Sequence, residues 1–286
     1  MTDTITVLAH AKLNLLLRVL AREDDGYHGI ETLFCRLALA DELVAERRDG
    51  TGVSIEVKGA DVGPAEDNLA ARAARLVLAA VRTPFAVHLR LAKRIPVGAG
   101  LGGGSSDAAA ALHAVNALGD NVVPRHELFQ FAGRLGADVA FCFSGAPLAL
   151  GWGHGERLLA LPPLPTAPLL LLTPPVPVRT ADAYGWVAQA RQGLGRRGAV
   201  ALDLASLSNW GSIGRMAGND FESPVFHRHP EVRRGFEAMV GTGPLVCRMT
   251  GSGSTVFAVY RSAADRDEAA IQLGKKYGKV IATETG

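Results

Sequence analysis

The sequence PVGAGLGGGSSDAAAA at residues 96–111 constrains the fold more than any other part of the chain. Five glycines lie between Gly98 and Gly104. Glycine adopts backbone conformations that a Cβ forbids, so its N–H groups can approach a ligand closely. Serine and aspartate are preferred N-caps and alanine is the strongest helix former, so a helix is expected to start near Ala108. A helix N-terminus combines unpaired amide donors with a positive dipole end, which predicts a loop for the phosphates of a nucleotide.

Other kinds of glycine loop fit less well. Gly98, Gly100 and Gly103 satisfy the GxGxxG pattern of dinucleotide-binding folds, but that pattern should directly follow a strand. Here Pro96 interrupts the approach, and Asp120 falls in a turn beyond a long helix instead of on a second strand. The sequence contains no Gly-Lys pair that completes a Walker loop, and no protein-kinase DFG signature. A glycine-rich linker is a further alternative, which the flanking strand and helix signals disfavour.

Length and composition limit the class of protein. With 286 residues, 48% of them apolar, the chain is long enough for two domains, and a net charge of +2 gives no basic footprint for nucleic acid. Cys35, Cys142 and Cys247 are odd in number and far apart, which predicts buried thiols in a reducing compartment. The N-terminus has no signal-peptide pattern, and the proline-broken apolar segment at residues 162–177 is too short to span a bilayer. We therefore expect a cytoplasmic protein without a membrane segment.

Hydrophobic periodicity predicts strands and helices in the first half of the chain. We expect strands at residues 4–20, 32–39 and 85–91, a hairpin over residues 41–57, and helices at residues 67–82, 108–118 and 124–135. The sequence GADVAFCF at residues 136–143 predicts a junction between a helix and an apolar strand. Asp138 lies at this junction, where an aspartate is often a helix cap.

The second half of the chain begins with a shift in composition, and we place a domain boundary near residue 163. We expect helices at residues 180–192, 200–207, 230–240 and 265–277, and strands at residues 246–250, 256–260 and 280–283. The sequence MTGSGSTVF at residues 249–257 predicts either a tight hairpin or a second phosphate-binding turn.

Two polar residues interrupt the first predicted strand. Lys12 and Asn14 lie on the opposite face of the alternation from Leu13, Leu15 and Leu17. A lysine in an apolar strand is usually an edge residue or one that extends its amine to solvent. Because Asn14 shares the face of Lys12, a polar site is the stronger interpretation.

Taken together, these motifs resemble those of the GHMP small-molecule kinases, over essentially the whole chain. The resemblance rests on AKLNL at residues 11–15 with DGYH at residues 25–28, on PVGAGLGGGSSDAAA at residues 96–110, and on MTGSGSTVF. GADVAF at residues 136–141 and NDFE at residues 219–222 are further matches. DGYH and the Gly-Gly-Gly-Ser-Ser-Asp core are typical of one subfamily. It phosphorylates the 2-hydroxyl of 4-diphosphocytidyl-2-C-methyl-D-erythritol in the non-mevalonate route to isoprenoids. Thr250 and Ala140 are small departures from the usual pattern.

The resemblance implies an α+β, two-domain GHMP kinase. Residues 1–163 would form an ATP-binding domain of the ribosomal protein S5 domain 2-like type, and residues 164–286 a ferredoxin-like C-terminal domain. Asp138 would be the general base and Lys12 would lie beside it, where a lysine keeps a carboxylate ionised and neutralises charge on the transferred phosphoryl group. The cofactors would be ATP and Mg²⁺. The sequence assigns no ligand to the metal.

The same resemblance implies binding residues for both ligands. The residues expected at ATP are Asn68, Lys93, Pro96, Gly98, Ala99, Gly100, Leu101, Gly102, Gly103, Gly104, Ser105 and Ser106. Those expected at the cytidine diphosphate-linked small-molecule substrate are Asn14, Tyr27, His28, Asp138, Thr180 and Tyr184. Tyr27 and Tyr184 would sandwich the cytosine, although core packing is an alternative role for Tyr184.

The expected protein has no nucleic-acid or membrane partner and is a monomer or a homodimer. Two other functional classes stay open, and each has its own test. A nicotinamide-dependent oxidoreductase would change nicotinamide absorbance on mixing. A non-catalytic nucleotide-binding relative would have no need of Lys12 together with Asp138.

Overall fold

The computed structural model describes residues 3–23, 28–81, 84–190 and 202–286. The chain divides into two compact units. Unit 1 comprises Met1–Lys12, Leu39–Val97 and Gly102–Ala146, and unit 2 comprises Leu13–Ala38, Gly98–Leu101 and Pro147–Gly286. Two long strands, residues 4–22 and 28–48, contribute residues to both units. The two compact units are therefore not separated by a single boundary in the sequence. Within the described ranges, no helix is long and apolar enough to cross a bilayer.

Unit 1 contains a sheet built on the alternating apolar residues of its strands. Its strands come from β1 (Thr4–Arg22), β2 (His28–Arg48), β3 (Gly52–Lys58) and β4 (Ala86–Ala92). β4 pairs antiparallel with β2 and parallel with β3, so β4 lies between the two strands. The predicted hairpin over residues 41–57 is therefore wrong. Residues 49–51 join β2 to β3, but these two strands do not pair with each other. Instead β4, which is distant in sequence, pairs with both of them.

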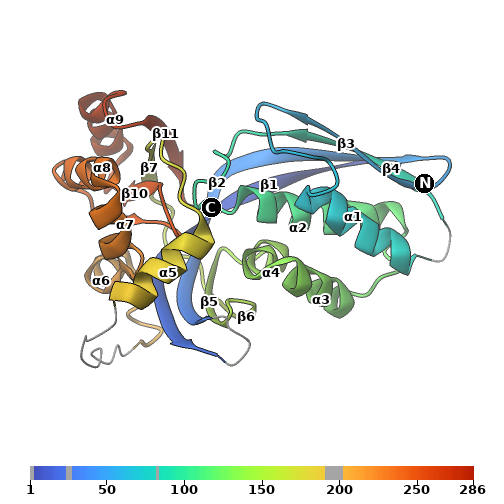
Figure 1. Ribbon diagram of the computed structural model, residues 1–286, viewed down its shortest axis with the longest axis horizontal. Helices are drawn as coiled ribbons and strands as arrows, with labels where there is room; N and C mark the ends of the chain where they lie inside the picture. The colour runs from blue at the N-terminus through green and yellow to red at the C-terminus, as the bar shows by residue number, and fades with distance from the viewer. Residues whose placement is uncertain (1–2, 24–27, 82–83, 191–201) are drawn as a thin grey trace. The chain divides into compact units, whose positions relative to one another are not determined.

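Four helices cover one face of this sheet (Figure 1). They are α1 (Leu69–Ala80), α2 (Gly103–Leu118), α3 (Arg125–Leu135) and α4 (Ala137–Ser144). Alanines of α1 and α2, such as Ala74 and Ala111, are fully buried in the core of the unit. Small side chains let the two helix backbones approach closely, which fixes where α2 begins relative to the sheet.

The strand expected after Gly136 is wrong, because residues 137–144 form the helix α4. A short apolar run suits a buried helix as well as a strand, and periodicity alone does not distinguish the two. Val139, Ala140, Phe141 and Phe143 are all buried, as a helix covered on most sides requires.

Unit 2 contains a four-stranded sheet with the strand order β11-β7-β10-β9. Its strands are β7 (Pro168–Thr173), β9 (Val246–Met249), β10 (Val256–Val259) and β11 (Lys279–Glu284). Both neighbours of β7 and both neighbours of β10 are antiparallel. Two helices, α8 (Pro230–Val240) and α9 (Ala263–Leu273), lie on one side of the sheet (Figure 1). This order and the helix connections give the predicted ferredoxin-like fold, and β9 and β10 form the predicted hairpin.

The rest of unit 2 includes strands outside this sheet, which pair with β1 and β2 or with each other. It comprises β5 (Leu148–Gly153), β6 (Arg157–Leu161), α5 (Thr180–Ala190), α6 (Trp210–Met216), β8 (Gly218–Asn219) and α7 (Glu222–Arg228). The helix predicted at residues 200–207 is wrong over residues 202–207, where the chain forms a turn, and residues 200–201 lie outside the described ranges. The short helices α6 and α7 were not predicted, because seven residues carry too little periodic signal.

Candidate functional site

Lys12 and Asp138 form an ion pair in unit 1, with 3.1 Å between Nζ and Oδ2. The side chain of Lys12 is only 3% exposed, whereas that of Asp138 is 35% exposed. The interpretation of Lys12 as an edge residue that reaches solvent is therefore wrong. A buried ammonium that pairs with a partly accessible carboxylate leaves the carboxylate able to contact a ligand.

Asp138 lies in the first turn of α4, two residues after the N-cap Gly136. The aspartate is therefore not the helix cap that its position in the sequence suggested. The positive end of a helix dipole stabilises a carboxylate in the first turn. The helix end and Lys12 thus place two positive groups beside the Asp138 carboxyl, which is the residue type of a general base.

The glycine loop leads directly into α2, as predicted, but the helix starts earlier than expected. Its first residue is Gly103, so Ser105, Ser106 and Asp107 lie inside the helix and are not caps. The N-cap is Gly102, in the left-handed conformation with φ 69°, and no side chain of the described residues caps the helix. The first intrahelical bond runs from Ser106 N to Gly102 O. The amides of the first turn are thus available to an anion.

The start of α2 lies between two lysines of unit 1. A Cβ on Gly102 would lie 2.8 Å from Cγ of Lys12, and a Cβ on Gly103 would lie 3.2 Å from Nζ of Lys93. The Gly103 position is also closed by Ile95, whose Cγ2 would be 3.0 Å away. Glycine is required here because α2 approaches these side chains more closely than any larger residue allows.

Lys93 is buried between two aspartates. Its Nζ donates to Oδ2 of Asp41 and, at 2.6 Å, to Oδ2 of Asp107. Oδ1 of Asp41 also accepts the amides of Arg94 and Ile95. Lys93 was predicted at the nucleotide, and the structure shows its ammonium tying α2 to the strands β2 and β4. No pattern in the sequence singled out Asp41, because its partners are 52 or more residues away.

Cys142 lies on α4, one turn after Asp138, near Ser106 and Lys12. Burial, together with the charge of Asp138, raises the pKa of its thiol to about 12. The thiol is therefore neutral at ordinary pH and behaves as a small apolar side chain behind the ion pair. Cys35 and Cys247 are free and buried, as predicted.

Asn14 belongs to a separate polar cluster in unit 2. Its Nδ2 donates to Oγ1 of Thr32 at 2.8 Å, and its Oδ1 accepts the amide of Gly251 at 3.1 Å. The backbone N–H of Asn14 donates to Oγ1 of Thr250 at 3.1 Å. Asn14 thus joins β1 to the turn between β9 and β10. Thr250 stands where the family often has serine. Its hydroxyl accepts this bond as a serine hydroxyl would, so the substitution keeps the contact.

The same turn contacts the first half of the glycine loop. Oγ1 of Thr250 donates to the carbonyl of Gly100 at 3.3 Å, and a Cβ on Gly100 would lie 2.4 Å from the carbonyl of Thr250. Ala99 and Leu101 are buried on either side of Gly100, whereas Gly98 and Gly104 are exposed and Pro96 is half-buried. The loop is therefore anchored from Ala99 to Leu101, whereas Gly98 and Gly104 stay accessible.

Asn219 holds this turn from the other side. Its Nδ2 donates to the carbonyls of Met249 and Gly251, each at 2.8 Å, and its Oδ1 accepts the amide of Phe221 at 2.9 Å. Glu222 accepts the amide of Met249 at 2.9 Å, and burial raises the pKa of its carboxyl. The motif NDFE was noted in the sequence without a role, and the structure shows that it fixes the turn.

The residues predicted at the cytidine lie near α5 in unit 2. His28 stacks on Tyr184, with 5.6 Å between ring centroids, and Tyr184 packs edge-on against Phe221 at 4.9 Å. Thr180 and Ser252 share a hydrogen bond of 3.1 Å between their hydroxyls. Tyr27 lies outside the described residues. Asn68, predicted at the nucleotide, caps α1 by accepting the amide of Ala70 at 2.9 Å.

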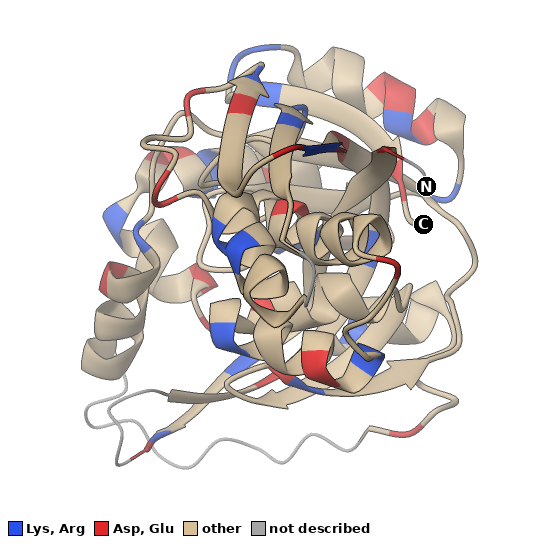
Figure 2. Cartoon of the chain, turned by 90° about the vertical axis from the view of Figure 1, so that its right-hand side faces the viewer, with Lys and Arg blue, Asp and Glu red and all other residues tan. Residues whose placement is uncertain are grey.

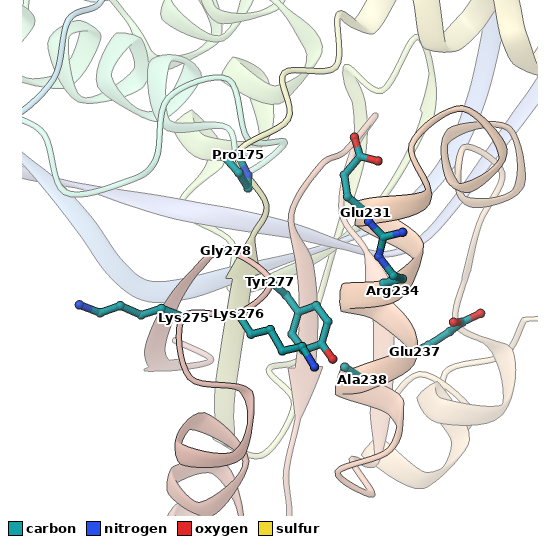
Figure 3. A pocket seen from close by; sticks show the side chains of 9 residues that line it. All are labelled: Pro175, Glu231, Arg234, Glu237, Ala238, Lys275, Lys276, Tyr277 and Gly278. Atoms are coloured by element: carbon teal, nitrogen blue, oxygen red, sulfur yellow. The ribbon is translucent and has the colours of Figure 1, made fainter.

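A cavity of about 690 Å³ opens elsewhere in unit 2 (Figure 3). The residues that line it come mainly from α8 and from the turn between α9 and β11. They are Pro175, Glu231, Arg234, Glu237, Ala238, Lys275, Lys276, Tyr277 and Gly278. None of these residues belongs to the sequence motifs, and in Figure 3 the side chains of Lys275 and Lys276 extend in different directions. The cavity therefore gives no reason to move the candidate site from the motif residues.

The chain is similar to known proteins over most of its length. The chain matches the family described as GHMP kinases N terminal domain over residues 68–146, and GHMP kinases C terminal over residues 200–279. A protein of Moorella thermoacetica named 4-diphosphocytidyl-2-C-methyl-D-erythritol kinase is 39% identical, with 99% of each chain covered. A protein of Paraburkholderia phytofirmans with the same name is 38% identical, over 98% of this chain and 94% of its own.

The chain is also similar to solved structures of this family. A crystal structure of 4-(cytidine 5'-diphospho)-2C-methyl-D-erythritol kinase is 36% identical, with a TM-score of 0.83 and 99% of each chain covered. Homoserine kinase from Cytophaga hutchinsonii, 22% identical, has a TM-score of 0.73 over 100% of this chain and 95% of its own. At this lower identity the likeness shows the fold alone.

Proposed function

Because the chain belongs to the GHMP kinases, and within them to the 4-diphosphocytidyl-2-C-methyl-D-erythritol kinases, we propose that it phosphorylates the 2-hydroxyl of 4-diphosphocytidyl-2-C-methyl-D-erythritol. The phosphoryl donor is ATP, and the products are the 2-phosphate and ADP. The reaction belongs to the non-mevalonate route to isoprenoids. The observation that carries the proposal is the ion pair of Lys12 and Asp138 beside the uncapped N-terminus of α2.

In this proposal Asp138 takes the proton of the 2-hydroxyl as the oxygen attacks the γ-phosphorus of ATP. Lys12 pairs with Asp138 and neutralises charge on the phosphoryl group during transfer. Phosphoryl transfer has a loose transition state, so positioning and electrostatics supply most of the rate enhancement. The close packing of Lys12 against Gly102 suits that requirement, because a Cβ at Gly102 would lie only 2.8 Å from Cγ of Lys12.

The phosphates of ATP bind along the loop from Pro96 to Ser106, whose amides and helix end favour anions. Asn68 and Lys93 support the same region through α1 and α2. Mg²⁺ accompanies the triphosphate and offsets its charge. Among the described residues, no group of three or more His, Cys, Asp and Glu side chains could hold a metal ion. We expect phosphate oxygens and water to hold most of the ligand positions of the ion.

The cytosine of the substrate stacks on Tyr184 and Tyr27, and His28 and Asn14 bind its edge and the polar groups beyond it. The edge-on contact with Phe221 supports this role because it fixes the plane of the Tyr184 ring. Thr180 contributes a hydroxyl at the start of α5.

The remaining features of the proposed enzyme follow the same family. It has an ATP-binding domain at residues 1–163 and a C-terminal domain at residues 164–286, is cytoplasmic, and acts as a monomer or homodimer. It binds no nucleic acid or membrane. In the view of Figure 2, Lys and Arg of the described residues are interspersed with Asp and Glu.

The deciding experiment measures ADP release with candidate acceptors. We expect turnover with 4-diphosphocytidyl-2-C-methyl-D-erythritol, and none with mevalonate, homoserine or a hexose. Turnover with one of those acceptors instead would keep the family and overturn the substrate. A change in nicotinamide absorbance without ADP release would overturn the kinase itself.

A further inference from the structure

The two aspartates that share Lys93 are not equally satisfied. Both carboxylate oxygens of Asp41 have donors, from Lys93 and from two backbone amides. Asp107 has one donor, at Oδ2, and its Oδ1 is buried without a hydrogen-bond partner among the residues that the structure describes. When both aspartates are ionised, one ammonium faces two carboxylates. The cluster of Asp41, Lys93 and Asp107 then carries a net negative charge.

This cluster lies beneath the helix end that accepts phosphate in the proposed function. Asp107 follows Gly103 by one helical turn, which places it about 6 Å along the axis of α2. The Lys93 ammonium lies close to Gly103, since its Nζ would be 3.2 Å from a Cβ at that position. Charges this close interact strongly in a buried setting, where water and salt screen little.

The charge of the cluster changes near neutral pH. Burial is the main cause that raises the pKa of the Asp107 carboxyl to about 7; Lys93 opposes the rise, and the neighbouring Asp41 adds to it. The other titratable group that faces it is Cys142 on α4, which is neutral because its own pKa is about 12. An aspartate that shares an ammonium with a second aspartate is the expected group to bind a proton.

We propose that Asp107 sets the affinity of the α2 N-terminus for phosphate, because its ionised form opposes the bound phosphates and its neutral form does not. This inference rests on the proposed function, in which ATP binds at that helix end. Asp107 contacts no reacting atom. It acts through Lys93 and the first turn of α2, and is therefore a positioning residue that tunes ATP binding without taking part in the transfer.

The test compares the dissociation constant of MgATP for the wild type and for Asp107→Asn, which keeps the shape of the side chain. At about pH 8.5, where Asp107 is ionised, we expect the variant to bind ATP about tenfold more tightly, because a charge at this range is worth roughly that factor. At about pH 5.5 the two proteins should bind alike. The ionisation of ATP cancels in the ratio. The value of kcat should change by less than about twofold.

Glu56→Gln is the matched control, since it removes one carboxylate from an exposed ion pair with Lys58 on β3. It should leave the ratio unchanged at every pH. Weaker ATP binding by Asp107→Asn at every pH would overturn the inference and make Asp107 a purely structural residue. Equal affinity of the variant and the wild type at about pH 8.5 would overturn it as well. If the wild type binds no ATP, the proposed function fails first.

A measurement on the wild type needs no variant. The ¹³C shift of the Asp107 carboxyl, followed against pH, gives the midpoint of its titration. Because coupling between two binding events is reciprocal, saturating ATP should raise that midpoint by about one pH unit. A midpoint that stays in place when ATP binds would overturn the inference.

Discussion

Replacing Gly102 by alanine should damage the protein twice, once in stability and once in catalysis. Gly102 has φ +69°, and an L-residue in this conformation costs about 1–2 kcal/mol. The new Cβ would also lie 2.8 Å from Cγ and 3.0 Å from Cε of Lys12, about 0.6 Å inside ordinary contact for the nearer atom. Lys12 must then move, and its ion pair with Asp138 must lengthen.

The stability effect is measured as the midpoint of urea unfolding, which we expect to fall by the equivalent of about 1–2 kcal/mol. The catalytic effect is measured as kcat for ADP release at saturating substrates. Misplacement of a catalytic group by 1 Å can cost about a hundredfold, so a displacement of about half that size should cost about tenfold or more.

Gly133→Ala is the control for both measurements. Gly133 lies in α3, also in unit 1, its φ is not in the left-handed range, and a Cβ there meets nothing within 4 Å. Alanine in a helix interior is favoured over glycine, so this variant should be more stable by about 0.5–1 kcal/mol and fully active. If Gly102→Ala matches Gly133→Ala in both stability and kcat, the argument that Gly102 positions Lys12 is wrong.

Four further predictions test other parts of the site. Asp138→Asn should lower kcat by about 10² or more while the dissociation constant of ATP stays within about twofold, and an equal loss of both would make Asp138 structural. Asn219→Ala leaves two carbonyls and one amide unpaired, so the free energy of unfolding should fall by about 2 kcal/mol or more in urea titrations. The raised pKa of Glu222 means that the native state binds its proton more tightly than the unfolded state, so Glu222 costs stability as pH rises above its unfolded pKa. Glu222→Gln should therefore gain stability over the wild type at neutral pH, with no gain in acid; a constant difference across pH would contradict this. The thiols should resist iodoacetamide at pH 8 until the protein unfolds, because burial raises the pKa of Cys35 and Cys142 to about 12 and that of Cys247 higher still; mass spectrometry of the native protein checks this.

Local signals in the sequence predicted much of the fold. The helix α8 has its predicted bounds, because a proline at the start and a strong apolar stripe mark it clearly. The hairpin of β9 and β10 was also one of the two structures expected from a short-range pattern. The site residues in AKLNL at residues 11–15 and in the glycine loop at residues 96–110 could be chosen because their residue types suit phosphate chemistry. Their contacts with ligands stay predictions.

The features that the sequence did not predict depend on contacts between distant segments. The helix α2 begins at Gly103 against the intrinsic preference of glycine, because packing against Lys12 and Lys93 leaves no room for a side chain. The place of β4 between β2 and β3 depends on a parallel pairing that spans a helix. Asp41 and Asn219 gain their roles from partners that lie up to 54 residues away, and no local pattern marks such residues.

The contact between Gly100 and the turn after β9 has a consequence for hybrid proteins. A Cβ on Gly251 would lie 3.2 Å from Cα of Gly100, and a Cβ on Gly100 would strike the carbonyl of Thr250. Two main chains therefore meet here with no side chain between them, so neither partner can be altered to compensate for a change in the other. A chimera that takes its two halves from different relatives should fold well only if the first parent supplies glycine at position 100 and the second supplies glycine at position 251.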